Sequence, residues 1–115
     1  LRVLLVEDNA IVAGAMRWML MSFGHEVDLI ADGQAAWDEL SGRPGHYEVV
    51  FTDLNLPGIS GVELVRRLRR TGYAGMVVVY SGYISDAHRT ELTSLGVEHL
   101  LAKPVDRAQL LRVLG

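Results

Sequence analysis

Residues that can bind a cation or a phosphoryl group follow four short apolar segments of this chain. They are Glu7, Asp8, Asp53, Ser81 and Lys103, and the segments before them are residues 3–6, 49–52, 76–80 and 100–102. Short β-branched runs are typical of buried strands in a parallel sheet. Ligands bind such sheets at the carboxyl ends of the strands. The sequence therefore predicts three carboxylates, a hydroxyl and an ammonium at one edge, which is a donor set for a divalent cation and a phosphoryl group.

The acidic members of this set favour a hard cation. Glu7, Asp8 and Asp53 repel one another when they lie close together, and a bound cation relieves that repulsion. Mg2+ prefers oxygen ligands and takes one or two carboxylates together with waters and a phosphate. Each acid alone is compatible with a helix cap or a solvated loop, but their joint position at the ends of neighbouring strands favours the cation site.

The carboxylate of Asp53 is also a candidate nucleophile, because a carboxylate can attack phosphorus to form an acyl phosphate. A Pro-Gly pair follows Asp53 within five residues and predicts a turn, which leaves the backbone carbonyl of Asn55 free to face the cation. Ser81 can hydrogen-bond a phosphoryl oxygen, and Lys103 can pair with a carboxylate or a phosphoryl group. Pro104 favours a tight turn that aims Lys103, because an X-Pro bond can be cis.

The elements that carry these residues alternate as strand and helix five times, which is the pattern of βαβ units. We expect helices over residues 10–23, 33–40, 60–70, 86–95 and 106 to the end, with Asp32, Ser60 and Ser85 as N-caps and Gly96 as a C-terminal stop. Segments 25–29 and 98–101 look half exposed, as edge strands do. Right-handed crossovers then give an α/β fold, a doubly wound (βα)5 parallel sheet of five strands in the flavodoxin-like order 2-1-3-4-5. Its switch point places Asp8 beside Asp53.

The composition indicates one domain of ordinary charge. The chain has 115 residues, half of them hydrophobic, and a net charge of −3, which gives no electrostatic argument for binding nucleic acid. It has no cysteine, which excludes disulfides and thiolate metal sites and is compatible with a reducing compartment. No stretch approaches the roughly 20 apolar residues of a membrane span. We expect residues 1–115 to be a domain of a longer multidomain protein, without membrane or nucleic-acid contacts of its own.

Together these motifs give the chain a resemblance, over its whole length, to the receiver domains of two-component response regulators. The specific motifs are Glu7-Asp8, Asp53 with Pro57-Gly58, and Lys103-Pro104. The resemblance implies a cytoplasmic phosphoprotein in which Asp53 accepts a phosphoryl group from a phosphohistidine. The implied partner is a sensor histidine kinase or a histidine phosphotransfer protein, and the domain is compatible with fusion to a kinase or an effector. Such a module catalyses only its own phosphorylation and dephosphorylation and acts on no external substrate.

The resemblance also implies a Mg2+ site and a role for each residue around it. Asp8, Asp53 and the backbone carbonyl of Asn55 would hold the ion, and Glu7 would act through a water. The residues implied to bind or sense the phosphoryl group are Lys103 as its cationic partner, Ser81 as the switch hydroxyl, Gly82 as the small residue that leaves room, and Pro104 with a cis peptide bond before it.

One position departs from the family pattern. The family usually carries Tyr or Phe three residues before the lysine, as a switch aromatic that rotates, and this chain has Leu100 there. A leucine cannot exchange a ring between buried and exposed positions. The usual coupling between Ser81 and the surface of the fourth helix, fifth strand and fifth helix is therefore expected to differ.

The first predicted helix is apolar almost all round, with Arg17 nearly alone as a charge. A helix needs only one apolar stripe for burial, so part of this surface should be exposed and available to a partner. In the family this helix is where a histidine-bearing four-helix bundle docks, and Val12 and Ala15 fall on that face. The alternative is burial of the helix by a neighbouring domain or a dimer partner.

Two other functions remain open at this level. The first is a degenerate receiver that acts only as a protein interaction module, which Leu100 favours and the complete set of site residues opposes. The second is a Mg2+-dependent phosphohydrolase of the haloacid dehalogenase type, which also uses an aspartyl nucleophile. That family places its nucleophile after the first strand in an Asp-x-Asp arrangement, whereas here Glu7 and Asp8 are adjacent and Asp53 follows the third strand.

Overall fold

Strands and helices alternate along the whole chain, as the sequence predicts. The computed structural model describes residues 1–114. The strands are β1 (Arg2–Val6), β2 (Glu26–Ile30), β3 (Val49–Asp53), β4 (Met76–Ser81) and β5 (His99–Ala102). The helices are α1 (Ala10–Ser22), α2 (Gly33–Gly42), α3 (Gly61–Arg70), α4 (Asp86–Ser94) and α5 (Arg107–Leu114).

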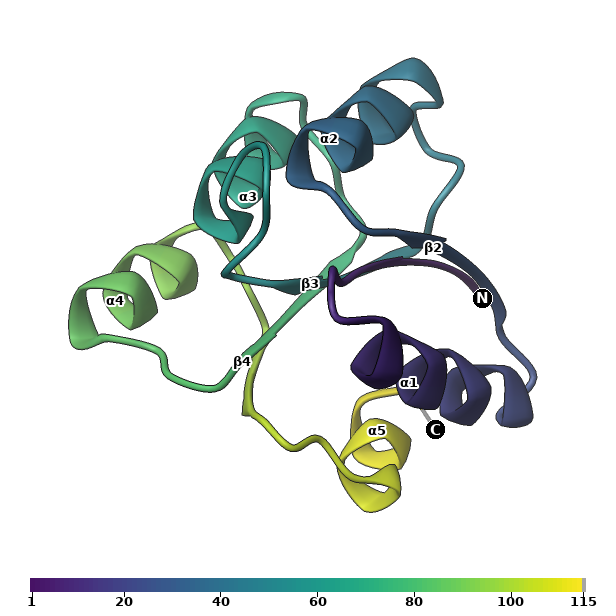
Figure 1. Ribbon diagram of the computed structural model, residues 1–115. Coiled ribbons are helices and arrows are strands. Elements are labelled where there is room, and N and C mark those ends of the chain that lie inside the picture. The colour runs from purple at the N-terminus through teal and green to yellow at the C-terminus, as the bar shows by residue number, and fades with distance from the viewer. Residues whose placement is uncertain (115) are drawn as a thin grey trace.

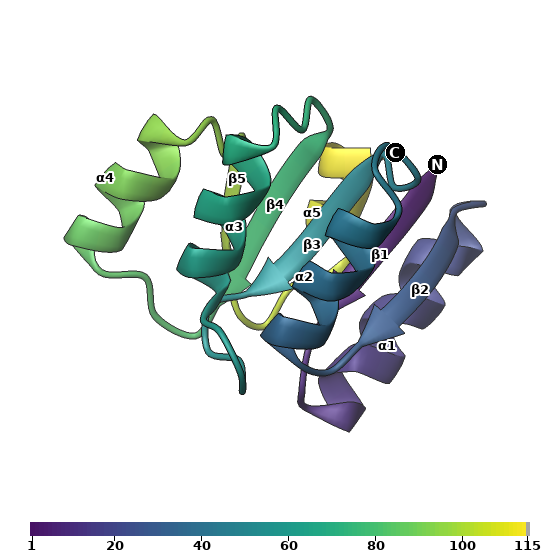
Figure 2. The ribbon, with the colours of Figure 1, turned by 90° about the horizontal axis from the view of Figure 1, so that it is seen from above.

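The strands form one parallel sheet in the order β2-β1-β3-β4-β5, which confirms the predicted flavodoxin-like topology (Figure 2). The partly exposed strands β2 and β5 are its edges, and β1, β3 and β4 lie between them. The order reverses between β1 and β3, so the carboxyl ends of these two strands lie side by side.

Helices cover both faces of the sheet, with α2, α3 and α4 on one side and α1 and α5 on the other (Figure 1). Side chains alternate between the two faces along each strand. Those facing α2, α3 and α4 include Leu4, Val6, Val50, Val77 and Val79. Those facing α1 and α5 include Val3, Leu5, Val49, Phe51, Val78 and Tyr80. This alternation decides on which side of the sheet each residue at a strand end emerges.

Side-chain caps start four of the helices. The predicted N-caps are confirmed, because Asp32, Ser60 and Ser85 accept hydrogen bonds from the first-turn amides of α2, α3 and α4. Asn9 caps α1 in the same way, by accepting from the amides of Ile11 and Val12. Each of these helices therefore begins at a defined point beyond the carboxyl end of a strand.

The helix ends agree with the predicted boundaries within two residues. The glycine at position 96 adopts a φ of +76° after α4, which is the left-handed conformation that stops a helix. The largest difference is in α2, which continues to Gly42 although the pattern predicts an end at residue 40. Pro44 sets the actual end, since it keeps Arg43 before it out of the helical region (φ −132°, ψ 65°). Within residues 1–114, no helix has both the length and the apolar character to cross a membrane.

Candidate functional site

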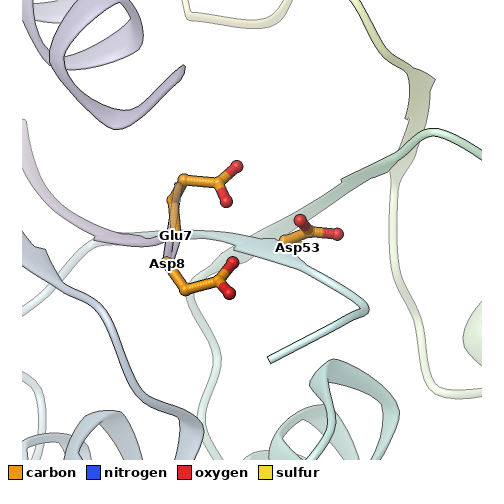
Figure 3. A group of neighbouring side chains, drawn as sticks. All are labelled: Glu7, Asp8 and Asp53. Atoms are coloured by element: carbon orange, nitrogen blue, oxygen red, sulfur yellow. The ribbon is translucent and has the colours of Figure 1, made fainter. Parts of the chain in front are cut away.

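Three carboxylates meet at the carboxyl ends of β1 and β3. One oxygen from each of Glu7, Asp8 and Asp53 lies within 4.8 Å of the others, which is the predicted juxtaposition. Figure 3 shows Glu7 and Asp8 leaving the end of β1 in opposite directions, with Asp53 beside them. Glu7 is 1% exposed and Asp53 4% exposed, whereas Asp8 is open to solvent. The cluster therefore concentrates negative charge that is buried at Glu7 and Asp53 and open to solvent at Asp8.

Lys103 supplies the positive charge next to this cluster. Its Nζ donates a hydrogen bond to Asp53 Oδ2 at 2.7 Å and forms an ion pair with Glu7 Oε1 at 3.0 Å. Burial lowers the pKa of Lys103, but the hydrogen bonds to Asp53 and Glu7 outweigh that effect and raise its pKa. Lys103 is thus charged at neutral pH, and it compensates one of the three carboxylates in charge.

Backbone amides orient the two buried acids. Asn55 donates its amide to Asp53 Oδ1 at 3.2 Å, and Asn9 donates its amide to Glu7 Oε2 at 3.1 Å. The two carboxylates are therefore held on one side by the backbone and on the other by Lys103.

The start of α3 packs directly against the end of β3. A β-carbon on Gly61 would lie 2.2 Å from the carbonyl oxygen of Asp53 and 2.8 Å from Leu54 Cα, so only glycine fits. The amide of Gly61 donates to the carbonyl of Leu54 at 2.9 Å. This contact fixes the loop that carries Asn55.

Ser81 ends β4 at the same edge. Its Oγ is buried and has no hydrogen-bond partner in the described part of the chain, which is unusual for a buried hydroxyl. The amide of Lys103 donates to the carbonyl of Ser81 at 2.9 Å, and the peptide bond between Lys103 and Pro104 is cis. Beside Ser81, a β-carbon built on Gly82 meets nothing within 4 Å. Position 82, directly after Ser81, thus borders open space.

Comparison with known proteins identifies this arrangement. The sequence profile of the response regulator receiver domain matches residues 3–115. The chain belongs to the response regulator receiver family. It is 35% identical over 111 residues to response regulator RppA of Synechocystis sp., a match that covers 96% of this chain and 47% of RppA. It is 30% identical to the osmosensing histidine protein kinase SLN1 of Saccharomyces cerevisiae, covering 98% of this chain and 10% of the kinase.

The fold comparison agrees with the family. A CheY-like receiver domain from Methanospirillum hungatei superposes with a TM-score of 0.90 at 21% identity, covering 98% of this chain and 89% of that one. At that identity the likeness shows the fold alone. The receiver domain described here spans about half or less of the length of the curated relatives above, and those relatives include a receiver fused to a kinase.

The position of the usual switch aromatic is occupied by a half-buried leucine. Leu100 lies in β5 opposite Val79 of β4 and packs against the core on the α2, α3 and α4 side. An exposed aromatic, Tyr83, follows Ser81 by two residues and is 79% exposed. The receiver domain therefore has no aromatic ring at the β5 position that could rotate between core and solvent.

The first helix of the receiver domain exposes large apolar side chains, as its composition predicts. Ile11 is 85% exposed and Trp18 68% exposed. Half-buried Val12 and exposed Ala15 lie on the part of α1 that borders the site. They line a groove together with Met16, Met19, Lys103, Pro104 and Val105.

Several residues that shape the site belong to no motif in the sequence. Asn9 acts by donating its backbone amide to Glu7, and Gly61 acts by letting α3 lie close to the end of β3. A sequence gives only a weak signal for either contact. The sequence predicts Tyr80 only as the last residue of an apolar strand. Its chemistry is the signal that could have marked it as a site residue. Tyr80 follows three valines in a buried strand and directly precedes Ser81, and a buried tyrosine hydroxyl needs a hydrogen-bond partner.

Proposed function

We propose that this receiver domain accepts a phosphoryl group on Asp53 from a phosphohistidine and so switches or relays a signal in a two-component system or phosphorelay. The observation that carries the proposal is the environment of the Asp53 carboxylate, which is buried, paired with Lys103 at 2.7 Å and clustered with two further acids. Phosphoryl transfer requires mainly positioning and charge neutralisation, and these groups supply both.

The donor set fits Mg2+ at this site. Three carboxylates with one ammonium leave a net negative charge, and oxygen ligands suit a hard cation. Asp8, Asp53 and the backbone carbonyl of Asn55 would hold the ion, with Glu7 acting through a water. The bound ion would neutralise charge on the phosphoryl oxygens during transfer.

The residues of this chain have distinct tasks in the transfer. A carboxylate oxygen of Asp53 forms the new bond to phosphorus as the phosphorus–nitrogen bond breaks and its electron pair returns to the donor imidazole. Lys103 already forms an ion pair with the Asp53 carboxylate, and it pairs with a phosphoryl oxygen once the phosphoryl group is attached to Asp53. Ser81 donates its free hydroxyl to another phosphoryl oxygen, next to the space at Gly82. The phosphoryl charge thereby changes the partners of Ser81 and Lys103, which is the local event that a switch requires.

The proposed partner is a sensor histidine kinase or a histidine phosphotransfer protein that docks on α1. The groove at Val12 and Ala15 supports this, because it is apolar and continues to the Lys103-Pro104 loop beside the site. The kinase-fused relative and the partial coverage of longer relatives also favour a domain that works within, or next to, a longer protein. Phosphorylation would act on the domain itself, without an external substrate.

The test is the intact mass of the protein after incubation with acetyl phosphate and Mg2+. We expect one added phosphoryl group, lost in Asp53→Asn and lost when a chelator removes the ion. A phosphohistidine phosphotransfer protein serves as the second donor if acetyl phosphate proves slow. A folded protein that neither binds Mg2+ nor gains mass from either donor would be an interaction module with a degenerate site.

A further inference from the structure

Tyr80 lies directly beside the proposed phosphoacceptor in the sheet. Asp53 and Tyr80 are register partners across β3 and β4. Val78 and Tyr80 face the same core as Val49 and Phe51, on the side covered by α1 and α5. Tyr80 is fully buried in that core, and its register partner is the proposed phosphoacceptor.

The ring of Tyr80 contacts the ammonium that pairs with the acids. Lys103 Nζ lies over the ring, 5.3 Å from its centroid, while the same atom lies 2.7 Å from Asp53 and 3.0 Å from Glu7. An ammonium over an aromatic face is attracted by the negative face of the ring, and more strongly where water is partly excluded. Tyr80 is thus a third partner of Lys103.

The hydroxyl of Tyr80 points toward the end of β1. It donates to the carbonyl oxygen of Val6 at 3.4 Å, one residue before Glu7. Burial and the charge of Glu7 raise the pKa of Tyr80, so the hydroxyl remains a protonated donor at neutral pH. Because this hydrogen bond is long, we expect it to contribute less than the contact between the ring and Lys103.

We propose that Tyr80 is a positioning residue whose ring holds the Lys103 ammonium between Glu7 and Asp53, in place to pair with the phosphoryl group. This inference rests on the proposed function and adds a residue to it. Lys103 is partly exposed, with 24% of its side chain accessible, and a lysine side chain has a flexible four-carbon stem. Without the ring, the Lys103 side chain would also adopt conformations in which the ammonium points toward solvent. A phosphoryl donor that arrives while the ammonium is in such a conformation would react more slowly.

A purely space-filling role makes different predictions. The three residues of β4 before Tyr80 are valines, and Phe51 fills the same core with its ring centroid 6.4 Å from that of Tyr80. If Tyr80 only filled space, its replacement and that of Phe51 by leucine would affect stability alike and leave phosphorylation alone. Phe51→Leu is therefore the matched control, because it shortens an aromatic side chain in the same core without touching Lys103.

The kinetic test compares wild type, Tyr80→Phe, Tyr80→Leu and Phe51→Leu by phosphorylation with acetyl phosphate, after circular dichroism shows each variant folded. Tyr80→Phe keeps the ring and should stay near the wild-type rate. Tyr80→Leu should lose about fivefold to tenfold in rate, with unchanged Mg2+ affinity, since the metal ligands keep their places. Phe51→Leu should phosphorylate normally.

A spectroscopic test follows the contact itself, because Lys103 is the only lysine in the chain. Protein labelled with 13C-lysine gives a single set of side-chain signals. The ring current of Tyr80 should move the Lys103 ε-methylene signals upfield relative to denatured protein. The shift should persist in Tyr80→Phe and Phe51→Leu and vanish in Tyr80→Leu.

The outcomes separate this inference from the function on which it rests. Equal rates in all three variants, or an equal loss in Tyr80→Phe and Tyr80→Leu, would overturn the positioning role of the ring. Absence of the upfield shift in wild type would overturn it even if Tyr80→Leu failed to fold. If wild type itself accepts no phosphoryl group, the proposed function fails, while the shift still reports whether Tyr80 holds Lys103.

Discussion

Asp8→Asn should stabilise the metal-free protein while abolishing its response to Mg2+. The carboxylates of Glu7, Asp8 and Asp53 lie within 4.8 Å of one another, and Lys103 pairs with the other two. Two unit charges at that distance repel by about 1 kcal/mol in water and about 3.5 kcal/mol at an effective dielectric constant of about 20. Asp8 is exposed, so the lower figure applies to each pair.

The net gain follows from the charges around Asp8. The substitution removes repulsion with two acids and forfeits attraction to one lysine, which leaves a stabilisation of about 1 kcal/mol. For a domain of this size that raises the melting temperature by about 4 °C. With Mg2+ the order should reverse, because an ion at 100 times its dissociation constant stabilises the wild type by about 2.7 kcal/mol and the variant lacks a ligand.

The assay is thermal unfolding of both proteins in EDTA and in saturating Mg2+. Asp38→Asn is the charge-matched control, since the side-chain oxygen of Asp38 accepts a hydrogen bond from Gln34 that asparagine can also accept. In about 1 M salt, where charges are screened within about 3 Å, the gain in EDTA should shrink. A loss of stability for Asp8→Asn in EDTA, or an equal gain for Asp38→Asn, would refute local repulsion at the site.

Other substitutions test the packing and the surface around the site. Gly14→Ala should add about 0.5–1 kcal/mol to the free energy of unfolding measured in urea, because its β-carbon meets nothing within 4 Å on α1. Gly61→Ala should cost about 1–3 kcal/mol in the same measurement, because its β-carbon would lie 2.2 Å from a β3 carbonyl oxygen. Tyr47→Phe should lower the melting temperature at neutral pH, because the hydrogen bond from the Tyr47 hydroxyl holds the pKa of Glu39 below its usual value. The stability from this bond is present above the pKa that Glu39 has in the unfolded chain, and it is lost as the pH falls through the pKa of Glu39 in the folded protein. The difference in melting temperature between wild type and Tyr47→Phe should therefore narrow in acid. Tyr83→Ala should shorten the lifetime of the acyl phosphate severalfold, as measured by the loss of the added mass with time, because a bulky ring two residues after Ser81 would shield the acyl phosphate from water.

The fold followed from the sequence because its signals are local and repeated. Each central strand is an apolar run that ends abruptly in a polar residue, and α2, α3 and α4 each begin at a predicted N-cap that the structure confirms. The strand order needed only the two weakest strands as edges and the handedness of the crossovers. The meeting of Asp8 with Asp53 followed from that order alone.

The finer shape of the site depends on register and contact, which no local pattern encodes. That Tyr80 lies beside Asp53 rather than one residue along requires the exact pairing of β3 with β4. The close approach of Gly61 to the end of β3 appears only when α3 is docked. Leu100 was visible as a departure in the sequence, but its half-buried place opposite Val79 was not.

Burial and pairing divide the acids of the site into two kinds. Glu7 and Asp53 are buried, and both are paired with Lys103, as buried charges must be. Asp8 is exposed and forms no ion pair within residues 1–114. In the proposed site, a cation from solvent would therefore first meet Asp8, the acid that is not paired with Lys103. Its binding there would add positive charge without displacing Lys103, so the proposed site would hold its metal and still keep an ammonium beside Asp53 for the phosphoryl group.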